Sequence, residues 1–448
     1  MSASGFQRPL GPVSLPSSMQ RSVEHKHAAQ AQVAWTALRE RAHAIKARAI
    51  ADLDRLLVRF EREFEARGGT VLWARTAEEA AALFVDICKR HGASSVVKGK
   101  SMLSEELELN RRLEGAGIEP VETDMGEFIV QLAGQRPSHI IAPAVHLSRE
   151  DVGALFRDKL GVPYSDDPAR LIAIASRRLR ERYLQAGVGM TGANFAIAET
   201  GTIVVVENEG NGGLSAAVPP VHVVVAGIEK VIPTLDDLLT FLPLLSRAGT
   251  GQKLTTYTHF FLGPEPGKAA YCIMVDAGRT QILRDAKIRE SLYCIKCGAC
   301  LSVCPIYRRT GGWAYGPVYA GPIGAILTPA MLGVRHHGEP TFASTLCGAC
   351  REECPVDIDL PHQLAYMRSK AVLADAPAAR PQRATLRWFA RAMRSLGMYG
   401  TAANIARAAL WTSTWSPWKP EAIRAWTSSR ELPRPAARSF KTWWRKRQ

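Results

Sequence analysis

The sequence predicts an α/β domain at residues 68–282, followed by a mainly α-helical, cysteine-rich domain at 283–372. A helical extension at 1–67 precedes them, and a basic helical tail at 373–448 follows them. Three observations support this order. Strand-like and helix-like segments alternate through the first domain, seven of the nine cysteines fall in the second, and positive charge is concentrated in the tail. A length of 448 residues agrees with two to three domains.

Residues 20–67 are expected to form one long helix-like stretch that packs over the next domain, because apolar side chains recur at roughly helical intervals from Ala34 to Phe60. The α/β domain then alternates strands and helices, which is typical of a largely parallel sheet covered by helices. Its expected strands are TVLWA (70–74), SSVVKG (94–99), GIEPVET (117–123), SHIIAP (138–143) and two or more strands within 196–228; its expected helices lie at about 76–91, 102–116 and 167–185.

The first cysteine run has the spacing of a ligand set for iron–sulfur clusters. It follows the pattern C-x2-C-x2-C-x3-C-P and consists of Cys294, Cys297, Cys300 and Cys304, with Pro305 after the last. In this pattern three thiolates bind one cluster and the fourth binds a second, so a partner run is required. The two-residue gaps place successive soft anionic sulfurs on neighbouring iron corners.

The second run supplies that partner with Cys347, Cys350 and Cys354, followed by Pro355. Crossing the ligands by pseudo-symmetry assigns Cys354 to the first cluster with Cys294, Cys297 and Cys300. The second cluster then receives Cys304, Cys347 and Cys350. Its fourth position is occupied by Ser344 instead of cysteine. Three interpretations stay open: a four-iron cluster with a non-cysteine ligand such as Ser344, a four-iron cluster with an open iron, or a three-iron cluster.

Zinc and disulfides explain the cysteines less well. Structural zinc takes four ligands, whereas seven cysteines with two C-x3-C-P endings exceed that number. Disulfides need an oxidising compartment, and the first 30 residues lack the apolar core of a secretory signal. A cytoplasmic protein with reduced thiols is therefore expected. Cys88 and Cys272 stand apart from both runs and are interpreted as buried small hydrophobic residues.

Two loops of the α/β domain are candidates for binding an anion or substrate. Lys98, Lys100 and Ser101 follow an expected strand and precede a helix, where free backbone N–H groups and the helix dipole attract a carboxylate or phosphate. The second candidate is the glycine-rich stretch that contains Glu199, Thr200 and Asn211, although such glycines commonly only form turns. No G-x-G-x-x-G or G-x4-G-K-[ST] motif is present, so no dinucleotide or nucleoside triphosphate site is expected.

The formal net charge of +15 is located mainly in the tail. Residues 371–448 hold 15 Lys and Arg against 3 Asp and Glu, together with seven of the ten tryptophans. This pattern favours an anionic membrane surface or an acidic partner protein, and no recognised nucleic-acid motif accompanies it. A helix is expected at 384–411, and a loosely ordered extension after it. A basic tail that docks on its own protein is the alternative.

The combination of ETGTIVVVENEGNG (199–212), CIKCGACLSVCPIYRRTGG (294–312), YAGPIGAILTP (319–329) and STLCGACREECPVDI (344–358) resembles the lactate utilization iron–sulfur protein B family over nearly the whole chain. The resemblance implies a LUD domain, an α/β fold related to the NagB/RpiA/CoA-transferase-like group, and a dicluster ferredoxin-type module. It also implies that the seven motif cysteines are the ligands of two clusters, which are expected to be of the 4Fe-4S type. Ser344 matches the family's ordinary pattern.

By the same resemblance, the chain is expected to work with two companion subunits in oxidising L-lactate to pyruvate, and to pass electrons through its two clusters. It would then be a component of an oxidoreductase complex, cytoplasmic and peripheral to the inner face of the membrane at most. Catalytic residues are not identified, and the substrate site is left open between this chain and a companion. One alternative is that the chain is the electron-transfer subunit for another 2-hydroxy acid oxidase or for a glycerol-phosphate oxidase. The other is a cluster-based redox sensor with a metabolite-binding LUD domain.

Overall fold

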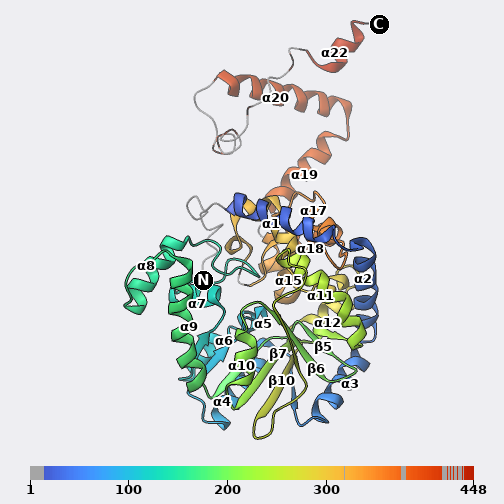
Figure 1. Ribbon diagram of the computed structural model, residues 1–448. Helices are drawn as coiled ribbons and strands as arrows, with labels where there is room; N and C mark the ends of the chain where they lie inside the picture. Colours follow the sequence, from blue (N-terminus) through green and yellow to red (C-terminus); the bar gives the residue numbers. More distant parts are fainter. Residues whose placement is uncertain are drawn as a thin grey trace. The chain divides into compact units, whose positions relative to one another are not determined.

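The computed structural model describes residues 15–316, 318–374, 380–415 and 438–447, together with single positions at 421, 424, 427, 431 and 436. The predictions for residues 1–14, for Trp418 and Trp426, and for most of the extension after 415 lie outside the described residues. The chain divides into two compact units, 1–377 and 378–448, and each is described by itself (Figure 1).

The centre of the first unit is a six-stranded sheet in the order β1-β10-β7-β4-β2-β3, in which every neighbouring pair is parallel. The strands are β1 (Thr70–Ala74), β2 (Ser95–Lys98), β3 (Glu119–Glu122), β4 (Val188–Thr191), β7 (Val221–Gly227) and β10 (Ala269–Val275). The predicted parallel α/β domain is confirmed. Because all six strands point the same way, their carboxyl ends meet at one edge of the sheet, where ligands commonly bind in α/β folds.

Both faces of this sheet are buried, as is usual for parallel sheets. In β7, Val223 and Val225 face a core shared with helices α4 (Ala77–Arg90) and α6 (Leu109–Gly115). The alternating residues Val224 and Ala226 face the opposite core. That second core is covered by a four-stranded sheet in the order β8-β5-β6-β9. Its strands are β5 (Phe195–Ile197), β6 (Thr202–Glu207), β8 (Val231–Ile232) and β9 (Tyr257–Phe261).

The remaining helices of this domain flank the two sheets. Helices α7 (Met125–Leu132), α8 (Arg149–Leu160) and α9 (Pro168–Gln185) form a third core with Val97 and Val121 of the sheet. Helix α8 begins with a capping box, in which the Ser148 and Asp151 side chains satisfy each other's backbone N–H groups. The others are α5 (Met102–Glu106), α10 (Asn211–Ala217), α11 (Leu235–Gly249) and α12 (Arg279–Arg284).

Three sequence predictions for this unit were wrong in detail. The stretch at 20–67 is three helices, α1 (Leu15–Gln30), α2 (Trp35–Ala51) and α3 (Leu53–Glu65), because the backbone leaves helical geometry at Ala34 and Asp52. The helix at 102–116 is split into α5 and α6, since Glu108 adopts φ 48°. SHIIAP is a loop and not a strand; Ile140 and Ile141 contribute to the packing around the cysteine loop instead of extending the sheet.

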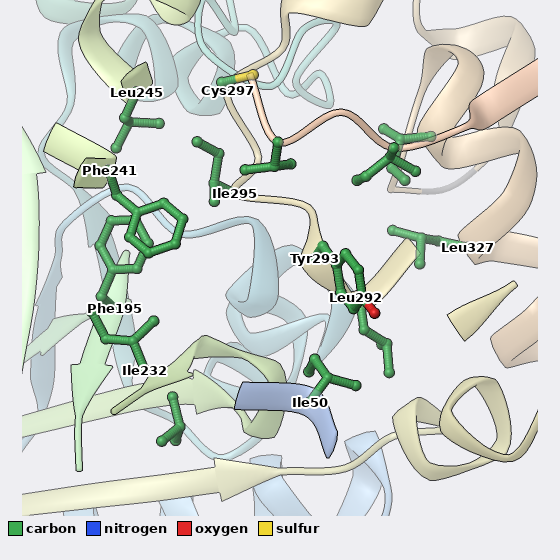
Figure 2. Close-up of a cluster of buried hydrophobic side chains, with 14 of the residues drawn as sticks. Ile50, Phe195, Ile232, Phe241, Leu245, Leu292, Tyr293, Ile295, Cys297 and Leu327 are labelled. Atoms are coloured by element: carbon green, nitrogen blue, oxygen red, sulfur yellow. The ribbon is translucent and has the colours of Figure 1, made fainter. Parts of the chain in front are cut away.

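The cysteine-rich part is built from short helices packed on the second core. These are α13 (Ala299–Val303), α14 (Pro305–Thr310), α15 (Gly321–Leu332), α16 (Val334–His337), α17 (Ala349–Glu352) and α18 (Leu360–Leu373), with 3-10 turns at Arg289–Tyr293, Trp313–Tyr315 and Glu339–Phe342. Phe195 and Phe241, whose ring centroids lie 5.0 Å apart, belong to the same buried cluster as Ile295 and Cys297 (Figure 2). The α/β and cysteine-rich parts therefore pack as one body.

The N-terminal helices also bind the cysteine-rich part directly. Arg39 of α2 donates a hydrogen bond from Nε to the Cys354 carbonyl oxygen at 2.7 Å, and its Nη2 donates to Asp357 at 2.9 Å. Nδ1 of His43 lies 3.0 Å from the Val356 carbonyl oxygen. Helix α1 contacts α11, α13 and α14. The N-terminal extension thus holds the end of the second cysteine run in place.

The second unit contains α19 (Arg380–Ala392), α20 (Leu396–Trp415) and α22 (Phe440–Arg445). The single helix predicted at 384–411 is two helices with a break at 393–395. Exposed apolar side chains are frequent here and include Trp388, Phe389, Trp443 and Trp444. Among the described residues, no helix combines the length and apolarity needed to cross a membrane.

Candidate metal centre and adjoining cavity

The first group of cysteines surrounds a small cavity inside the cysteine-rich part. Cys294, Cys297, Cys300 and Cys354 all line it. The Cys297 sulfur interacts electrostatically with those of Cys294 and Cys354, and Cys300 interacts with all three of the others. Cys354 of the second run therefore lies with the cysteines of the first run, as the crossed assignment predicts, and its role as a cluster ligand stays a prediction.

Local backbone geometry brings these sulfurs to one place. Lys296 and Gly298 adopt φ values of 60° and 72°, so the chain coils tightly between successive cysteines. The Lys296 and Ile358 backbone N–H groups donate to the sulfurs of Cys294 and Cys354, each at 3.4 Å. Pro305 occupies the first position of α14, where its missing N–H costs nothing. N–H groups directed at sulfur are among the features that tune iron–sulfur clusters.

The chemistry of this donor set fits an iron–sulfur cluster. Burial raises the pKa of the Cys354 thiol to about 12 and raises that of Cys300 well above its ordinary value. Buried thiols in an apolar wall, such as those of Cys300 and Cys354, stay neutral unless a metal compensates the thiolate charge. Within the described residues, no three His, Cys, Asp or Glu side chains converge closely enough for a single metal ion. A cluster needs a different arrangement, because its sulfur ligands bind separate irons.

The second group consists of Cys304, Cys347 and Cys350, and the Cys350 sulfur interacts electrostatically with the other two. The Tyr315 hydroxyl lies 3.9 Å from the Cys304 sulfur. Cys347 is exposed, whereas every cysteine of the first group is at least partly buried. The second group thus reaches the protein surface.

Ser344 lies on the loop that leads into this second group. Its Oγ accepts a hydrogen bond from the Leu346 backbone N–H at 3.1 Å, and its carbonyl oxygen accepts one from Arg368 at 2.6 Å. Leu346 adopts φ 55°, which turns the chain toward Cys347. The role of Ser344 as a cluster ligand stays a prediction.

A cavity of about 310 Å³ lies at the carboxyl edge of the parallel sheet, directly beside the first cysteine group. Its walls include the loops that follow β2, β3, β4, β6 and β7, the end of α11 and the start of α12. The ferredoxin-type part closes it with Lys296, Cys297 and Tyr319. The volume is at the lower end of the range of roughly 300–1,000 Å³ that small-molecule sites occupy.

A buried ionic network supports the wall beside the cysteines. The Arg279 Nε donates to Glu229 at 2.6 Å, and its two terminal nitrogens bind both oxygens of Glu106 at 2.8 and 3.0 Å. The Tyr319 hydroxyl donates to Glu106 at 2.6 Å. The Arg279 guanidinium lowers the pKa of Glu229 to about 2 against the opposing effect of burial. Residues of the α/β part and of the cysteine-rich part are therefore joined at the cavity.

The structure separates the predicted anion-binding residues. Lys100, Ser101 and Asn211 line the cavity. Lys98 does not line it, because its ammonium group forms a buried ion pair with Glu122 at 2.5 Å. The Glu199 carboxylate accepts the Leu235 N–H, and the Thr200 hydroxyl binds that of Thr202; neither residue lines the cavity.

The glycine-rich loop is not an open cradle for phosphate. The Gly212 and Gly213 N–H groups donate to the Glu207 carboxylate at 2.7 and 2.9 Å, and His259 binds the same carboxylate at 2.7 Å. These two backbone donors are thus satisfied within the protein and are not free to bind a phosphate.

Sequence reasoning missed Lys230, Arg279, Lys296 and Tyr319 as cavity residues. The position of Lys296 between two motif cysteines could have indicated that it lies near the site. The position of Lys230 shortly after the apolar strand that ends at Gly227 could have indicated the same. Arg279 and Tyr319 reach the cavity only through the packing of distant segments.

Two known protein families match consecutive parts of the chain. The LUD domain family matches residues 57–278, and the 4Fe-4S dicluster domain family matches residues 290–358. Lactate utilization protein B of Oceanobacillus iheyensis is 39% identical over 427 residues, which cover 92% of this chain and 88% of the relative. The chain belongs to the lactate utilization protein B family. The proteins of the same name from Bacillus cereus strain AH820 and Bacillus thuringiensis are each 38% identical over 420 residues, with the same coverage.

Membership of this family confirms the predicted LUD domain, the dicluster ferredoxin-type module and iron–sulfur clusters as the cofactors. It also confirms a role in lactate utilization at the level of the family. A solved structure, a DUF162 family protein from Deinococcus radiodurans, aligns with 50% of this chain and 98% of its own at 12% identity. Its TM-score of 0.27 is too low to support any argument.

Proposed function

We propose that this chain is the iron–sulfur electron-transfer subunit of a multi-subunit system that oxidises L-lactate to pyruvate, and that electrons pass through its two clusters. When bound, the clusters supply electron transfer, which none of the side chains provides. The observation that carries the proposal is that the cavity, the first cysteine group, the second cysteine group and the protein surface follow one another. Cys297 lines both the cavity and the first cysteine group, Cys300 interacts with Cys350 of the second group, and Cys347 is exposed.

The chain's own residues hold and shield the first cluster. Four cysteines supply its thiolates, and Ile295, Ile323 and Leu360 form the apolar wall that keeps water away. Lys26 of α1 is 2% exposed, donates from Nζ to the Ser302 hydroxyl at 2.9 Å and interacts electrostatically with Cys297 and Cys300. A buried cation next to thiolates stabilises added negative charge.

The relatives' name supports a system with further subunits, and we propose two companions. This chain would then be a component of a cytoplasmic lactate dehydrogenase complex and not a complete enzyme by itself. The exposed position of Cys347 favours an acceptor that docks near the second cysteine group.

We also propose that the tail holds the complex on the inner face of an anionic membrane, with an acidic partner protein as the alternative. Arg387, Arg391 and Arg394 recur at helical spacing on and directly after α19, and Trp388 and Phe389 are exposed beside them. Basic residues interleaved with aromatic ones suit the interface of an anionic bilayer.

The test is reconstitution of the anaerobically purified chain with its companions and measurement of dye reduction with L-lactate. We expect lactate-dependent reduction that Cys294→Ala abolishes. Cys88→Ala is the matched control, because Cys88 lies in α4, outside both runs. Reduction that persists in Cys294→Ala would overturn the proposal.

The same assay separates the alternative functions. Faster reduction with glycolate or glycerol phosphate than with L-lactate would favour another oxidase. No reduction with any of them, together with cluster-dependent binding of a partner, would favour the redox sensor.

A further inference from the structure

We infer that the cavity at the carboxyl edge of the parallel sheet binds a small monocarboxylate, a 2-hydroxy or 2-oxo acid, through the ammonium groups of Lys230 and Lys296. This inference rests on the proposed function and deepens it, because it places substrate binding in this chain and not in a companion.

Positive charge is in excess on the side of the cavity that contacts the cysteines. Arg279 is matched by two carboxylates, those of Glu106 and Glu229. Lys230 and Lys296 lie in the field of the same Glu229 and repel each other, and the buried Lys46 adds a third ammonium group to this field. An anion bound here would offset part of this positive charge.

The ammonium groups of Lys230 and Lys296 are both available to bind a ligand. Among the described residues, neither Lys230 nor Lys296 forms a side-chain hydrogen bond or an ion pair within 4.0 Å. The Lys296 Nζ lies 4.1 Å from the centroid of the Tyr319 ring, which holds it at the cavity wall. A cation pair without direct acidic partners at the wall of a cavity is a recognition element for an anion.

Three carboxylates, those of Asp124, Glu207 and Glu209, also line the cavity. Each of these carboxylates accepts at least one backbone N–H group, from Gly126, Gly212 and Met125 respectively. Their negative charge repels a ligand carboxylate and directs it toward the two lysines, while their remaining acceptor capacity suits a ligand hydroxyl group.

The position of the site links it to the cysteines. Lys296 stands between Cys294 and Cys297 in the chain, and Cys297 itself lines the cavity. A carboxylate held by Lys296 is therefore bound beside the first cysteine group.

The experiment is equilibrium dialysis of the full-length, iron-loaded protein against labelled L-lactate and labelled pyruvate. Lactamide, which has the shape of lactate without its charge, is the competitor that tests recognition of the carboxylate. We expect saturable binding of lactate or pyruvate and competition by lactamide that is at least ~10-fold weaker.

Two variants test the lysines. Lys230→Met and Lys296→Met are each expected to weaken binding at least ~10-fold, and the matching arginine variants to retain part of it. Lys287→Met is the control, because Lys287 is exposed and does not line the cavity. Iron content and the EPR spectrum of the reduced protein establish that each variant is folded and loaded.

Three results would overturn the inference: no saturable binding by the loaded wild type, equal competition by lactamide, or unchanged binding in both methionine variants. In the last case, an altered EPR spectrum would show that the lysines serve only to offset cluster charge. Lactate-dependent dye reduction without binding by this chain would overturn the inference and leave the proposed function intact. Binding of lactate or pyruvate without dye reduction in the reconstituted system would overturn the proposed function and leave the inference about the cavity intact.

Discussion

Lys26 and Ser302 are 276 positions apart in the chain, yet the Lys26 ammonium group donates a hydrogen bond to the Ser302 hydroxyl at 2.9 Å inside the protein. The contact joins α1 to α13, the helix that carries Cys300. It brings a positive charge into the apolar surroundings of the first cysteine group. The N-terminal extension is therefore part of the cluster's environment.

Lys26→Met should lower the reduction potential of the first cluster by an amount on the order of tens of millivolts, because loss of a buried positive charge destabilises the more negative, reduced state. Redox titration followed by EPR measures the change. Lys26→Arg retains the charge and should stay close to the wild type. Equal potentials in Lys26→Met and the wild type would show that solvent screens this charge.

The crossed ligand assignment predicts different losses for two neighbouring cysteines. Cys354→Ala should remove or convert the first cluster and leave the signal of the second, because the Cys354 sulfur faces Cys294 and Cys297. Cys350→Ala should do the opposite. Low-temperature EPR with iron and sulfide analysis distinguishes the two. Loss of the EPR signal of the same cluster in both variants would contradict the crossed ligand assignment.

The buried pair of Lys98 and Glu122 predicts a large effect on stability. Their side chains are 0% and 4% exposed. Lys98→Met should lower the free energy of unfolding by about 3–5 kcal/mol, since it leaves Glu122 as an uncompensated buried charge. Urea denaturation of the loaded protein measures it. Adding Glu122→Gln to Lys98→Met should recover part of the loss, and no recovery would indicate a packing defect instead.

His222 predicts a pH dependence of stability. Burial lowers its pKa to about 4, and its Nε2 lies 2.8 Å from the Thr191 hydroxyl. Between the ordinary pKa of 6.5 and this value the unfolded chain binds more protons than the folded one, so stability falls as the pH falls through this window. From about pH 7.5 to about pH 5.5 this group alone should cost about 1 kcal/mol. Subtracting the profile of His222→Gln from that of the wild type isolates the effect, and identical profiles would refute it.

The tail predicts binding to anionic lipid. Truncation after Ala374 should abolish salt-sensitive sedimentation with liposomes that contain an anionic phospholipid, and liposomes of neutral lipid should bind neither form. A triple variant of Arg387, Arg391 and Arg394 to glutamine keeps the chain length and should reproduce much of the loss. Unchanged sedimentation after truncation would leave an acidic partner protein as the better explanation.

Local patterns in the sequence were sufficient to predict the fold class, and they grouped the motif cysteines as the structure places them. The strands TVLWA and SSVVKG appear as β1 and β2, and Cys88 and Cys272 are buried as expected. The prediction of a strand at SHIIAP was wrong, because an apolar run indicates that its residues are buried but does not indicate which element packs against them. Ile140 and Ile141 pack around the cysteine loop instead of entering the sheet.

The sequence by itself determined the chemistry that depends on spacing along the chain: the two cysteine runs, the alternation of strands and helices, and the basic tail. Only the tertiary structure decided which loops meet. It brought Lys100, Lys230 and Lys296 to one cavity and took Lys98 into an ion pair with Glu122. The physical reason is that parallel strands carry residues distant in sequence to one edge of a sheet, and the packing of the cysteine-rich part on that edge is not encoded in any local pattern.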